Sequence, residues 1–292
     1  MQIALYGRQF GIQFRPFAEK LLDRLRSYNI RISMYKPFYL FMKNEAGLDP
    51  KPDKLFNSYK DLDLKSDFVF SIGGDGTILE TIKIVRDSGI PVMGINSGRL
   101  GFLASISGID TDMAVDALLA GKYSIEKRSL LKLVSAGGTF GDFPFALNEF
   151  TLQKKDSTMI TIQAWLNNDF LNSYWADGLI ISTPTGSTAY SLSVGGPLLT
   201  SDIRGIVISP IAPHNLTVRP IVIPDSNIIR LKVNSRNSEF LLSMDYQSAI
   251  LPAETEIVLK RSDFDISLVR LDHQDFYTTL RSKLMWGADK RN

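Results

Sequence analysis

The sequence predicts an N-terminal Rossmann-like α/β domain, a C-terminal mostly β domain of sandwich type, and a last helix that returns to the first domain. Three observations support this prediction. Strand and helix patterns alternate over residues 1–123, short β-branched or alternating runs fill 124–272, and a helical pattern resumes within 273–292. We therefore assign 1–123 and 273–292 to the α/β domain and 124–272 to the β domain.

The α/β domain follows from its alternating patterns along the chain. Apolar residues at helical spacing, such as Leu21, Leu22 and Leu25, separate short apolar runs that have the length of buried strands. Strands separated by helices favour βαβ units and a parallel sheet. The stretch 40–60, rich in Lys, Asp, Asn and Pro, predicts a loop or a mobile flap near the cleft. The expected strands are Ile3–Tyr6, Ile30–Tyr35, Asp67–Ile72 and Pro91–Asn96, and the expected helices are Arg15–Tyr28, Thr77–Ser88 and Asp110–Leu119.

The second half changes in character from about Ser124. Short runs suited to half-buried or buried strands are separated by turn signals such as Gly137-Gly138 and Pro224-Asp225. The segment Gln274–Trp286 then predicts a terminal helix. The expected strands are Leu130–Ser135, Phe145–Leu152, Ile160–Leu166, Gly178–Ser182, Gly205–Ser209, Ile228–Val233, Phe240–Met244, Glu256–Lys260 and Ile266–Leu271.

Composition narrows the classes of function. The chain has 292 residues, 44% hydrophobic and 22% charged, which is typical of a globular protein of roughly two domains. A net charge of +2, from 33 basic and 31 acidic residues, argues against a nucleic-acid partner. No apolar run approaches the ~18 residues that span a membrane, so no membrane partner is expected. The first residues resemble a strand rather than a signal peptide.

The scarcity of cysteine and histidine limits the chemistry. Cysteine is absent, which excludes disulfides, thiolate nucleophiles and Cys-ligated zinc and makes the cytoplasm the expected compartment. Two histidines, His214 and His273, are too few for a multi-histidine metal site. We therefore expect no protein metal site, and we expect carboxylates to carry any general-base chemistry.

The run Gly73-Gly74-Asp75-Gly76-Thr77 is the most informative motif, because it places one carboxylate inside a glycine-rich turn between a strand and a helix. Glycines let backbone N–H groups approach a phosphate, and the helix N-terminus adds partial positive charge. An aspartate there is suited to accept a proton from a hydroxyl or to hold a metal. A tight turn capped by Asp75 explains the Gly-Asp-Gly part equally well.

A second group of polar residues spans 177–197. Asp177-Gly178 leads into an apolar run, which is followed by a stretch rich in hydroxyl side chains that ends at Tyr190. Hydroxyl and backbone groups at such a turn suit a purine or a ribose, and the tyrosine ring offers a face for stacking. The alternative is a Ser/Thr-rich surface loop.

Further carboxylates stand beside apolar runs. Asn148-Glu149 lies within such a run, so both side chains need partners if they are buried, and a ligand hydroxyl is one candidate. An exposed position beside a turn is the alternative reading. Asp177 is likewise either a ligand contact or an exposed residue beside a turn. Asp245 follows the strand Phe240–Met244, where a plain turn role is the default.

These motifs together resemble those of the NAD kinase family. The turn at 73–77 is similar to that family's first signature, and the block 177–197 is similar to its Asp-Gly…Thr-Pro-Thr-Gly-Ser-Thr-Ala-Tyr…Gly-Gly-Pro stretch. Family members often have Asp-Gly where this chain has Asp245-Tyr246. The resemblance runs from about residue 67 to 287. Further agreement lies in Asn96–Leu103, Asn148-Glu149, Pro213-His214, Arg219–Val222 and Leu280–Gly287.

The resemblance implies transfer of a phosphoryl group to the 2′-hydroxyl of the adenosine ribose of NAD+, giving NADP+. The donor would be ATP, another triphosphate or polyphosphate, with Mg2+ carried mainly by the donor. Asp75 would hold and deprotonate the hydroxyl, beside phosphates cradled by the glycines of its turn. The resemblance also implies a homodimer or homotetramer in which a neighbouring subunit completes the site. The substrate-binding residues would be Gly73, Gly74, Gly76, Thr77, Asn148, Glu149, Asp177, Ser187, Thr188, Ala189, Tyr190 and Asp245.

Two other functions share part of these features. Lipid and sphingoid-base kinases have a similar glycine turn, but their Asn-Glu pair follows the turn closely, whereas here it lies far downstream at 148–149. A non-catalytic dinucleotide sensor is the second alternative, which the presence of Asp75 disfavours. Neither Gly-x-Gly-x-x-Gly nor a Walker A motif occurs, so a conventional Rossmann dehydrogenase and a P-loop enzyme are not expected.

Overall fold

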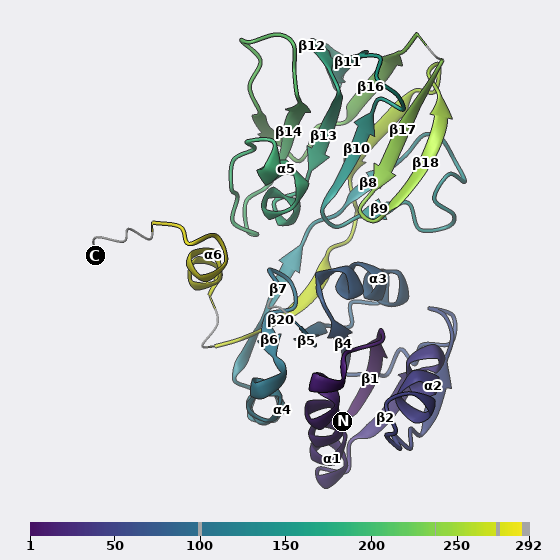
Figure 1. The fold of residues 1–292 in the computed structure, drawn as a ribbon, viewed down its shortest axis with the longest axis vertical. Helices are drawn as coiled ribbons and strands as arrows, with labels where there is room; N and C mark the ends of the chain where they lie inside the picture. The colour runs from purple at the N-terminus through teal and green to yellow at the C-terminus, as the bar shows by residue number, and fades with distance from the viewer. Residues whose placement is uncertain (99–100, 237, 273–274, 288–292) are drawn as a thin grey trace. The chain divides into compact units, whose positions relative to one another are not determined.

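The computed structural model describes residues 1–98, 101–236, 238–272 and 275–287, and it divides into two compact units (Figure 1). Unit 1 comprises Met1–Lys127 and Ile266–Asn292, and unit 2 comprises Arg128–Asp265. Unit 1 is an α/β domain and unit 2 is built from antiparallel sheets, so the predicted fold class is confirmed.

Unit 1 is organised around one sheet whose strands β1 to β6 and β20 pair in parallel. Its order is β3-β2-β1-β4-β5-β20-β7, with β6 beside β5. Strand β2 lies on one side of β1 and β4 lies on its other side, so the strand order reverses at β1. Open parallel sheets bind their ligands at the carboxyl ends of the strands at such a point. The strands are β1 (Gln2–Gly7), β2 (Arg31–Tyr35), β3 (Lys54–Phe56), β4 (Phe68–Gly73), β5 (Val92–Asn96), β6 (Ile106–Ser107), β7 (Tyr123–Arg128) and β20 (Ile266–Leu271).

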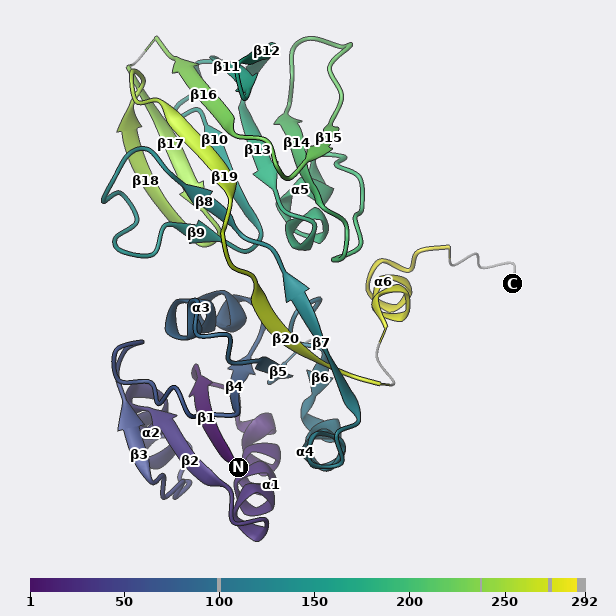
Figure 2. The same ribbon diagram turned by 180° about the vertical axis from the view of Figure 1, so that it is seen from behind.

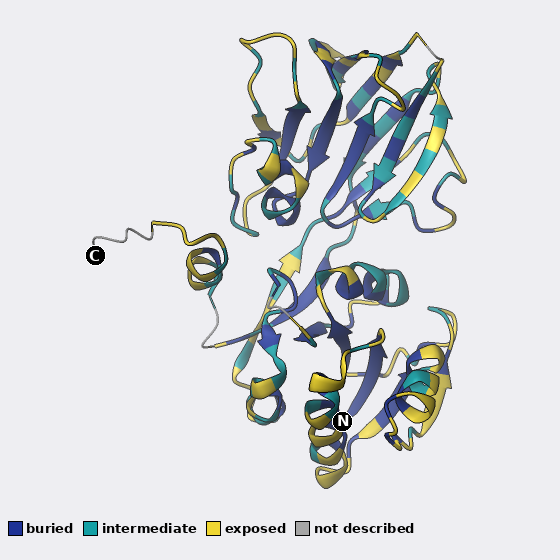
Figure 3. Ribbon diagram, viewed as in Figure 1, coloured by how far each residue is buried: buried dark blue, intermediate teal, exposed yellow. Residues whose placement is uncertain are grey.

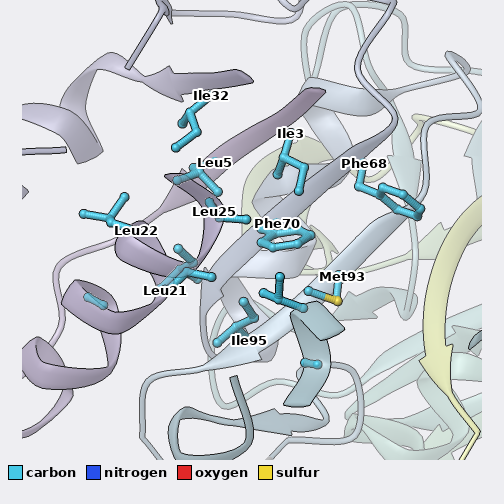
Figure 4. Packing of buried hydrophobic residues seen from close by; sticks show 14 of the residues in the cluster. Ile3, Leu5, Leu21, Leu22, Leu25, Ile32, Phe68, Phe70, Met93 and Ile95 are labelled. Carbon is cyan, nitrogen blue, oxygen red and sulfur yellow. The ribbon is translucent and has the colours of Figure 1, made fainter. Parts of the chain in front are cut away.

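The core of unit 1 is the apolar layer between the sheet and its helices. Figure 4 shows Leu21 and Leu25 of a helix against Ile3 and Phe70 of the strands, and all four side chains are buried. Their helical spacing is the one read from the sequence. The helices are α1 (Arg15–Ser27), α2 (Lys36–Asn44), α3 (Asp75–Val85), α4 (Thr111–Leu119) and α6 (Phe276–Leu284), with 3-10 turns η1 (Ile12–Phe14) and η2 (Gly108–Asp110).

Two parts of unit 1 differ from the sequence prediction. The stretch 40–60 is not a continuous loop, because it contains the end of α2 and all of β3. Pro37 sits in the first turn of α2, and Phe38 and Met42, four residues apart, are both buried. Helix α3 begins at Asp75 rather than Thr77, so the carboxylate belongs to its first turn.

The terminal helix groups with unit 1. Asp275 caps α6 by accepting a hydrogen bond from the Thr278 N–H at 2.8 Å, and Leu280 is buried. Residues 273 and 274, part of the predicted helical segment, lie outside the described residues. The strand Ile266–Leu271, counted above with the β domain, joins the parallel sheet of unit 1 as β20.

Unit 2 consists of two six-stranded sheets in the orders β15-β14-β13-β10-β17-β18 and β12-β11-β16-β19-β8-β9 (Figure 2). Central strands such as β13 are buried throughout, whereas β18 is alternately exposed, as the colours of Figure 3 show. Among the described residues, no helix is long and apolar enough to cross a membrane. The elements are β8 (Leu131–Leu133), β9 (Phe145–Ala146), β10 (Glu149–Gln153), β11 (Ile160–Leu166), β12 (Asp169–Ala176), β13 (Gly178–Ser182), η3 (Thr185–Thr188), α5 (Tyr190–Ser193), β14 (Gly205–Ile211), β15 (Ile221–Pro224), β16 (Ile229–Asn234), β17 (Glu239–Met244), β18 (Gln247–Pro252) and β19 (Ile257–Arg261).

Candidate active site

The glycine turn lies at the carboxyl end of β4, beside the point where the strand order reverses. A Cβ atom at Gly73 would stand 2.1 Å from Thr77 Oγ1, so only glycine fits there. Gly74 and Gly76 are exposed, and among the described residues a Cβ on either would meet nothing within 4 Å. The backbone at the N-terminus of α3 is therefore open to solvent and accessible to an anionic group.

The Asp75 carboxylate is held by the backbone of the loop 101–104. Its Oδ2 accepts the Phe102 N–H at 2.8 Å, and its Oδ1 accepts the N–H groups of Leu103 and Ala104 at 3.1 and 2.8 Å. A carboxylate accepts about four hydrogen bonds, so these leave room for one more at Oδ2. The arrangement fixes the orientation of Asp75 before any substrate arrives.

The loop 101–104 is shaped to bring its amides to Asp75. A Cβ atom on Gly101 would lie 1.7 Å from Asp75 Oδ1, so the loop approaches closely only because this residue has no side chain. Asn96, at the end of β5, is buried, and its Oδ1 accepts the Gly98 N–H at 2.7 Å. Residues 99 and 100, part of the predicted 96–103 motif, lie outside the described residues.

Unit 2 contains a similar arrangement around Asp245. Its Oδ2 accepts the Leu147 N–H at 2.9 Å, and its Oδ1 accepts the N–H groups of Asn148 and Glu149 at 2.9 and 3.1 Å. Asp245 follows β17 in the left-handed region, with φ of 49°, and its own N–H donates to the Glu149 carbonyl at 3.0 Å. Asp245 is thus a positioning residue for the Asn148-Glu149 backbone.

The hydroxyl-rich segment is tied to the same backbone. The Thr183 N–H donates to the Asn148 carbonyl at 2.9 Å, and Thr183 Oγ1 donates to the Leu147 carbonyl at 2.5 Å. A Cβ atom on Gly186 would stand 2.2 Å from the Asn148 carbonyl oxygen. The structure therefore brings together Asn148, Glu149, Asp245 and the start of the hydroxyl-rich segment, as parts of one local site.

Glu149 is the most perturbed acid of this site. The residue is only 9% exposed, and its Oε2 is buried with no hydrogen-bond partner among the described residues. Burial, and then repulsion from the Asp245 carboxylate, raise the pKa of Glu149 to about 8, although a hydrogen bond from the Tyr190 backbone opposes the shift. An unpartnered buried carboxyl oxygen is expected to receive a donor, such as a substrate hydroxyl.

The raised pKa of Glu149 predicts a pH-dependent stability. Between about pH 4.5 and 8 the folded chain keeps a proton that the unfolded chain releases, so the free energy of unfolding falls as pH rises through this window. Replacing Glu149 with Gln removes this pH-dependent loss of stability, which amounts to about 5 kcal/mol at most. Urea unfolding at pH 5 and pH 8 should show a smaller difference for Glu149→Gln than for wild type. Glu254→Gln, at an exposed turn, is the control and should keep the wild-type difference in the free energy of unfolding. If both variants show the same difference between pH 5 and pH 8, Glu149 is not the source of the pH dependence.

The predicted substrate-binding residues 187–190 have different environments. Ser187 is fully buried, and its hydroxyl bonds the Pro184 carbonyl at 2.7 Å and the Leu199 N–H at 3.0 Å. Thr188 and Ala189 are half-buried, and Tyr190 is 37% exposed. Ser187 therefore supports the turn, whereas the Tyr190 side chain is open to a ligand.

Asp177 lies apart from Glu149. On the paired strands β10 and β13, Glu149 is opposite Ser182, whereas Gln153 is opposite Gly178, the neighbour of Asp177. At ~3.4 Å per residue, Asp177 is about 14 Å or more from the Glu149 end of the pair. Its carboxylate pairs with Lys154 at 2.7 Å. Asp177 is nearer to Tyr190, whose hydroxyl accepts a hydrogen bond from Gln153 Nε2 at 3.0 Å, than to Glu149 at the other end of these strands.

Two parts of the site were not found by sequence reasoning. The backbone amides of 102–104 hold Asp75, and Asp245 was considered as a turn residue or a ligand contact rather than as the anchor of 147–149. Gly101 carried a signal, because a glycine after a buried strand often marks close backbone approach. Nothing in the sequence indicated which group it approaches.

The described residues supply no group of three or more His, Asp or Glu side chains placed to hold a metal ion. Mg2+ keeps several waters and is commonly bound through substrate phosphates with few protein carboxylates.

A carboxylate in an open glycine turn of a parallel sheet, without a Walker A loop, is suited to a phosphotransferase that acts on a hydroxyl group. Residues 38–123 match the family model described as ATP-NAD kinase N-terminal domain, and residues 147–271 match ATP-NAD kinase C-terminal domain. The chain belongs to the NAD kinase family, as the sequence motifs predicted, and its activity is that of an NAD kinase.

Similar proteins extend over the whole chain. A protein of Cytophaga hutchinsonii named NAD kinase is 45% identical over 293 residues, with both chains fully covered, and one of Bacteroides fragilis is 41% identical over 292 residues, also with full coverage. Among solved structures, yeast NADH kinase complexed with NADH aligns with a TM-score of 0.84 at 22% identity, covering 99% of this chain and 88% of that one. An NAD kinase from Archaeoglobus fulgidus in complex with ATP aligns at 0.74 and 21%, covering 98% and 99%. These two structures support the fold.

Proposed function

We propose that this NAD kinase uses Asp75 to orient the 2′-hydroxyl of the adenosine ribose of NAD+ for attack on the terminal phosphorus of ATP. The observation that carries the proposal is the set of three amides that fixes the Asp75 carboxylate while leaving one acceptor position at Oδ2. Phosphoryl transfer depends mainly on positioning and on charge stabilisation, so a pre-oriented acceptor beside a phosphate-binding turn suits the reaction.

In this mechanism the hydroxyl donates a hydrogen bond to Asp75 Oδ2. The 2′-oxygen attacks the terminal phosphorus, the bond from that phosphorus to the bridging oxygen breaks with its electron pair leaving on ADP, and the hydroxyl proton passes to Asp75. The open backbone at Gly74 and Gly76 would bind donor phosphate oxygens. Mg2+ bound to the donor would neutralise phosphate charge, and we propose no protein cage for it.

Unit 2 would hold the dinucleotide. The unpartnered Glu149 Oε2 would accept a ribose hydroxyl, Asn148 would contact the adenine or its ribose, and the exposed ring of Tyr190 would stack on the base. Thr188 and Ala189 would form the adjoining wall. Asp245 would act through the 147–149 backbone. Ser187 would act only by supporting the turn.

Asp177 would contact the nicotinamide side of a dinucleotide bound by a neighbouring subunit. Its distance from the Glu149 end of its own strands supports this assignment. We accordingly propose a homodimer or homotetramer. A cytoplasmic location stays a prediction from the absence of cysteine.

The direct test is NADP+ formation by the purified protein from NAD+ with magnesium and ATP, with a parallel incubation in polyphosphate. Product with either donor would support the reaction and identify the donor. NAD+ binding without product from any donor would contradict the proposal and favour the dinucleotide sensor. If the protein neither binds NAD+ nor forms product, the lipid or sphingoid-base kinase becomes the favoured alternative.

The Tyr190 ring provides a prediction for dinucleotide binding. We expect Tyr190→Ala to raise the Kd for NAD+ about tenfold or more, because base–aromatic stacking contributes ~1–3 kcal/mol. Tyr190→Phe keeps the ring and should stay within about threefold of wild type. Isothermal titration with NAD+ measures both. Unchanged affinity in Tyr190→Ala would remove this residue from the site.

A further inference from the structure

A cavity of about 730 Å3 in unit 1 lies between the segment that follows β1 and helix α2. We refer to it as the β1–α2 cavity. Its walls include residues 7–9 on one side and, on the other, Phe38, Leu40, Phe41 and Asn44 of α2 with Glu45 just after the helix. A volume of this size fits a ligand such as a nucleoside. None of the residues discussed above for the dinucleotide or for Asp75 lines it.

The β1–α2 cavity lies beside the glycine turn. Strands β1 and β4 pair in parallel with Gly7 opposite Ile72, and the Arg8 N–H donates to the Ile72 carbonyl at 3.2 Å. Neighbouring strands are ~4.8 Å apart, so the wall formed by Gly7 and Arg8 is one strand away from Gly73. Both features occupy the carboxyl edge of the sheet where the strand order reverses, which is the binding edge of this class of sheet.

The walls combine aromatic and polar groups. Phe38 lies so close to Gly7 that a Cβ there would stand 2.7 Å from its ring, and Phe41 adds a second ring. Polar groups come from Gln9, Asn44 and Glu45, with Gln9 Nε2 3.5 Å from both Glu45 carboxylate oxygens. Phe38 is buried, so the half-buried Phe41 ring is the one that can contact a flat base, and carboxylate and amide groups suit ribose hydroxyls.

Arg8 connects the cavity to the helix of the glycine turn. Its guanidinium binds the Glu80 carboxylate through Nε and Nη2, and Glu80 belongs to α3, which begins at Asp75. The Tyr6 hydroxyl donates to the same carboxylate at 3.2 Å. A guanidinium has five N–H donors, more than one carboxylate uses, so Arg8 can also contact phosphate oxygens that reach from the cavity toward Gly74.

We propose that the β1–α2 cavity binds the base and ribose of the nucleoside triphosphate donor, with Arg8 and the glycine turn along its phosphate chain. This inference rests on the proposed function, because it assigns a place to the donor of that reaction. It separates the two substrates: α2 and the segment after β1 recognise the donor nucleoside, whereas unit 2 recognises the acceptor dinucleotide.

The test fills the cavity and compares donors with and without a nucleoside. Leu40 lines the cavity and is 43% exposed, so Leu40→Trp adds bulk there without a core change. We expect the KM for ATP to rise at least tenfold while the KM values for NAD+ and inorganic tripolyphosphate stay within twofold. Leu64→Trp, at a 72% exposed leucine of unit 1 outside the cavity, is the matched control. Asn44→Trp repeats the test from the next turn of α2.

Direct binding of a fluorescent N-methylanthraniloyl derivative of ATP separates this inference from the activity. A tenfold weaker Kd in Leu40→Trp but not in Leu64→Trp supports the donor site even if no NADP+ forms. An unchanged Kd and KM for ATP in both cavity variants would overturn the inference while leaving the kinase activity intact. An equal loss with tripolyphosphate, or no ATP binding by the wild type, would also overturn it.

Discussion

Asp75→Asn is expected to lower kcat by about 10²–10⁴-fold, the range that general acid–base catalysis contributes, while the Kd for NAD+ changes less than tenfold, or ~1.4 kcal/mol. An asparagine can keep the bonds from Leu103 and Ala104 through one oxygen. Its NH2 group would then face the Phe102 N–H and cannot accept a proton. The loss should therefore appear in turnover rather than in binding of the dinucleotide.

Steady-state kinetics and NAD+ titration on the same preparation measure the two quantities. Asp87→Asn is the matched control, because Asp87 is an exposed aspartate just after α3 and its replacement should leave kcat unchanged. A near-normal kcat in Asp75→Asn would show that Asp75 neither orients nor deprotonates the hydroxyl. A loss of NAD+ affinity well above tenfold would instead indicate a binding role.

Gly101→Ala should reduce kcat nearly as much, although residue 101 has no side chain to react. The added methyl would stand 1.7 Å from Asp75 Oδ1, so either the carboxylate turns away or the loop 101–104 withdraws. Both outcomes break the hydrogen bonds that fix the Asp75 rotamer. A misplacement of about 1 Å at the reacting centre is sufficient to cost ~10²-fold in rate.

Gly98, which precedes the loop 101–104, supplies the control. Among the described residues other than its chain neighbours, the atom nearest to a Cβ on Gly98 would be Asn96 Oδ1 at 3.9 Å, so Gly98→Ala should retain activity and stability. Kinetics and thermal unfolding should be measured for both variants. Wild-type kcat in Gly101→Ala would mean that the contact between the loop and Asp75 has no part in turnover.

Much of the fold was predictable because it follows from local patterns. The helix α1 was predicted from apolar residues at helical spacing, and the parallel sheet from strands that alternate with helices. Helix α2 was missed because the charged and proline-containing sequence around it favoured a loop, although Phe38 and Met42 have helical spacing. Strand β20 was assigned to the wrong sheet, since an apolar run carries no signal for the partner it pairs with.

The candidate site, like the fold, was predicted in part from the sequence. Asp75 and Glu149 were recognisable because a carboxylate in a glycine turn or in an apolar run requires an explanation. The contacts that fix them were not recognisable, because they are made by backbone amides of 102–104 and by Asp245, both distant in sequence. Almost every residue has a backbone N–H group, so no sequence motif identifies which of these groups donates a hydrogen bond. Their partners became apparent only from the fold.

The two carboxylates that each bind three successive amides have a consequence for how this chain tolerates substitution. Because Asp75 and Asp245 bind N–H groups that nearly every amino acid possesses, the side chains of 102–104 and 147–149 are not needed for these contacts. Proline is the exception, since it alone lacks the N–H. The two loops can therefore change their side chains to suit a different ligand while the backbone geometry around each carboxylate is preserved.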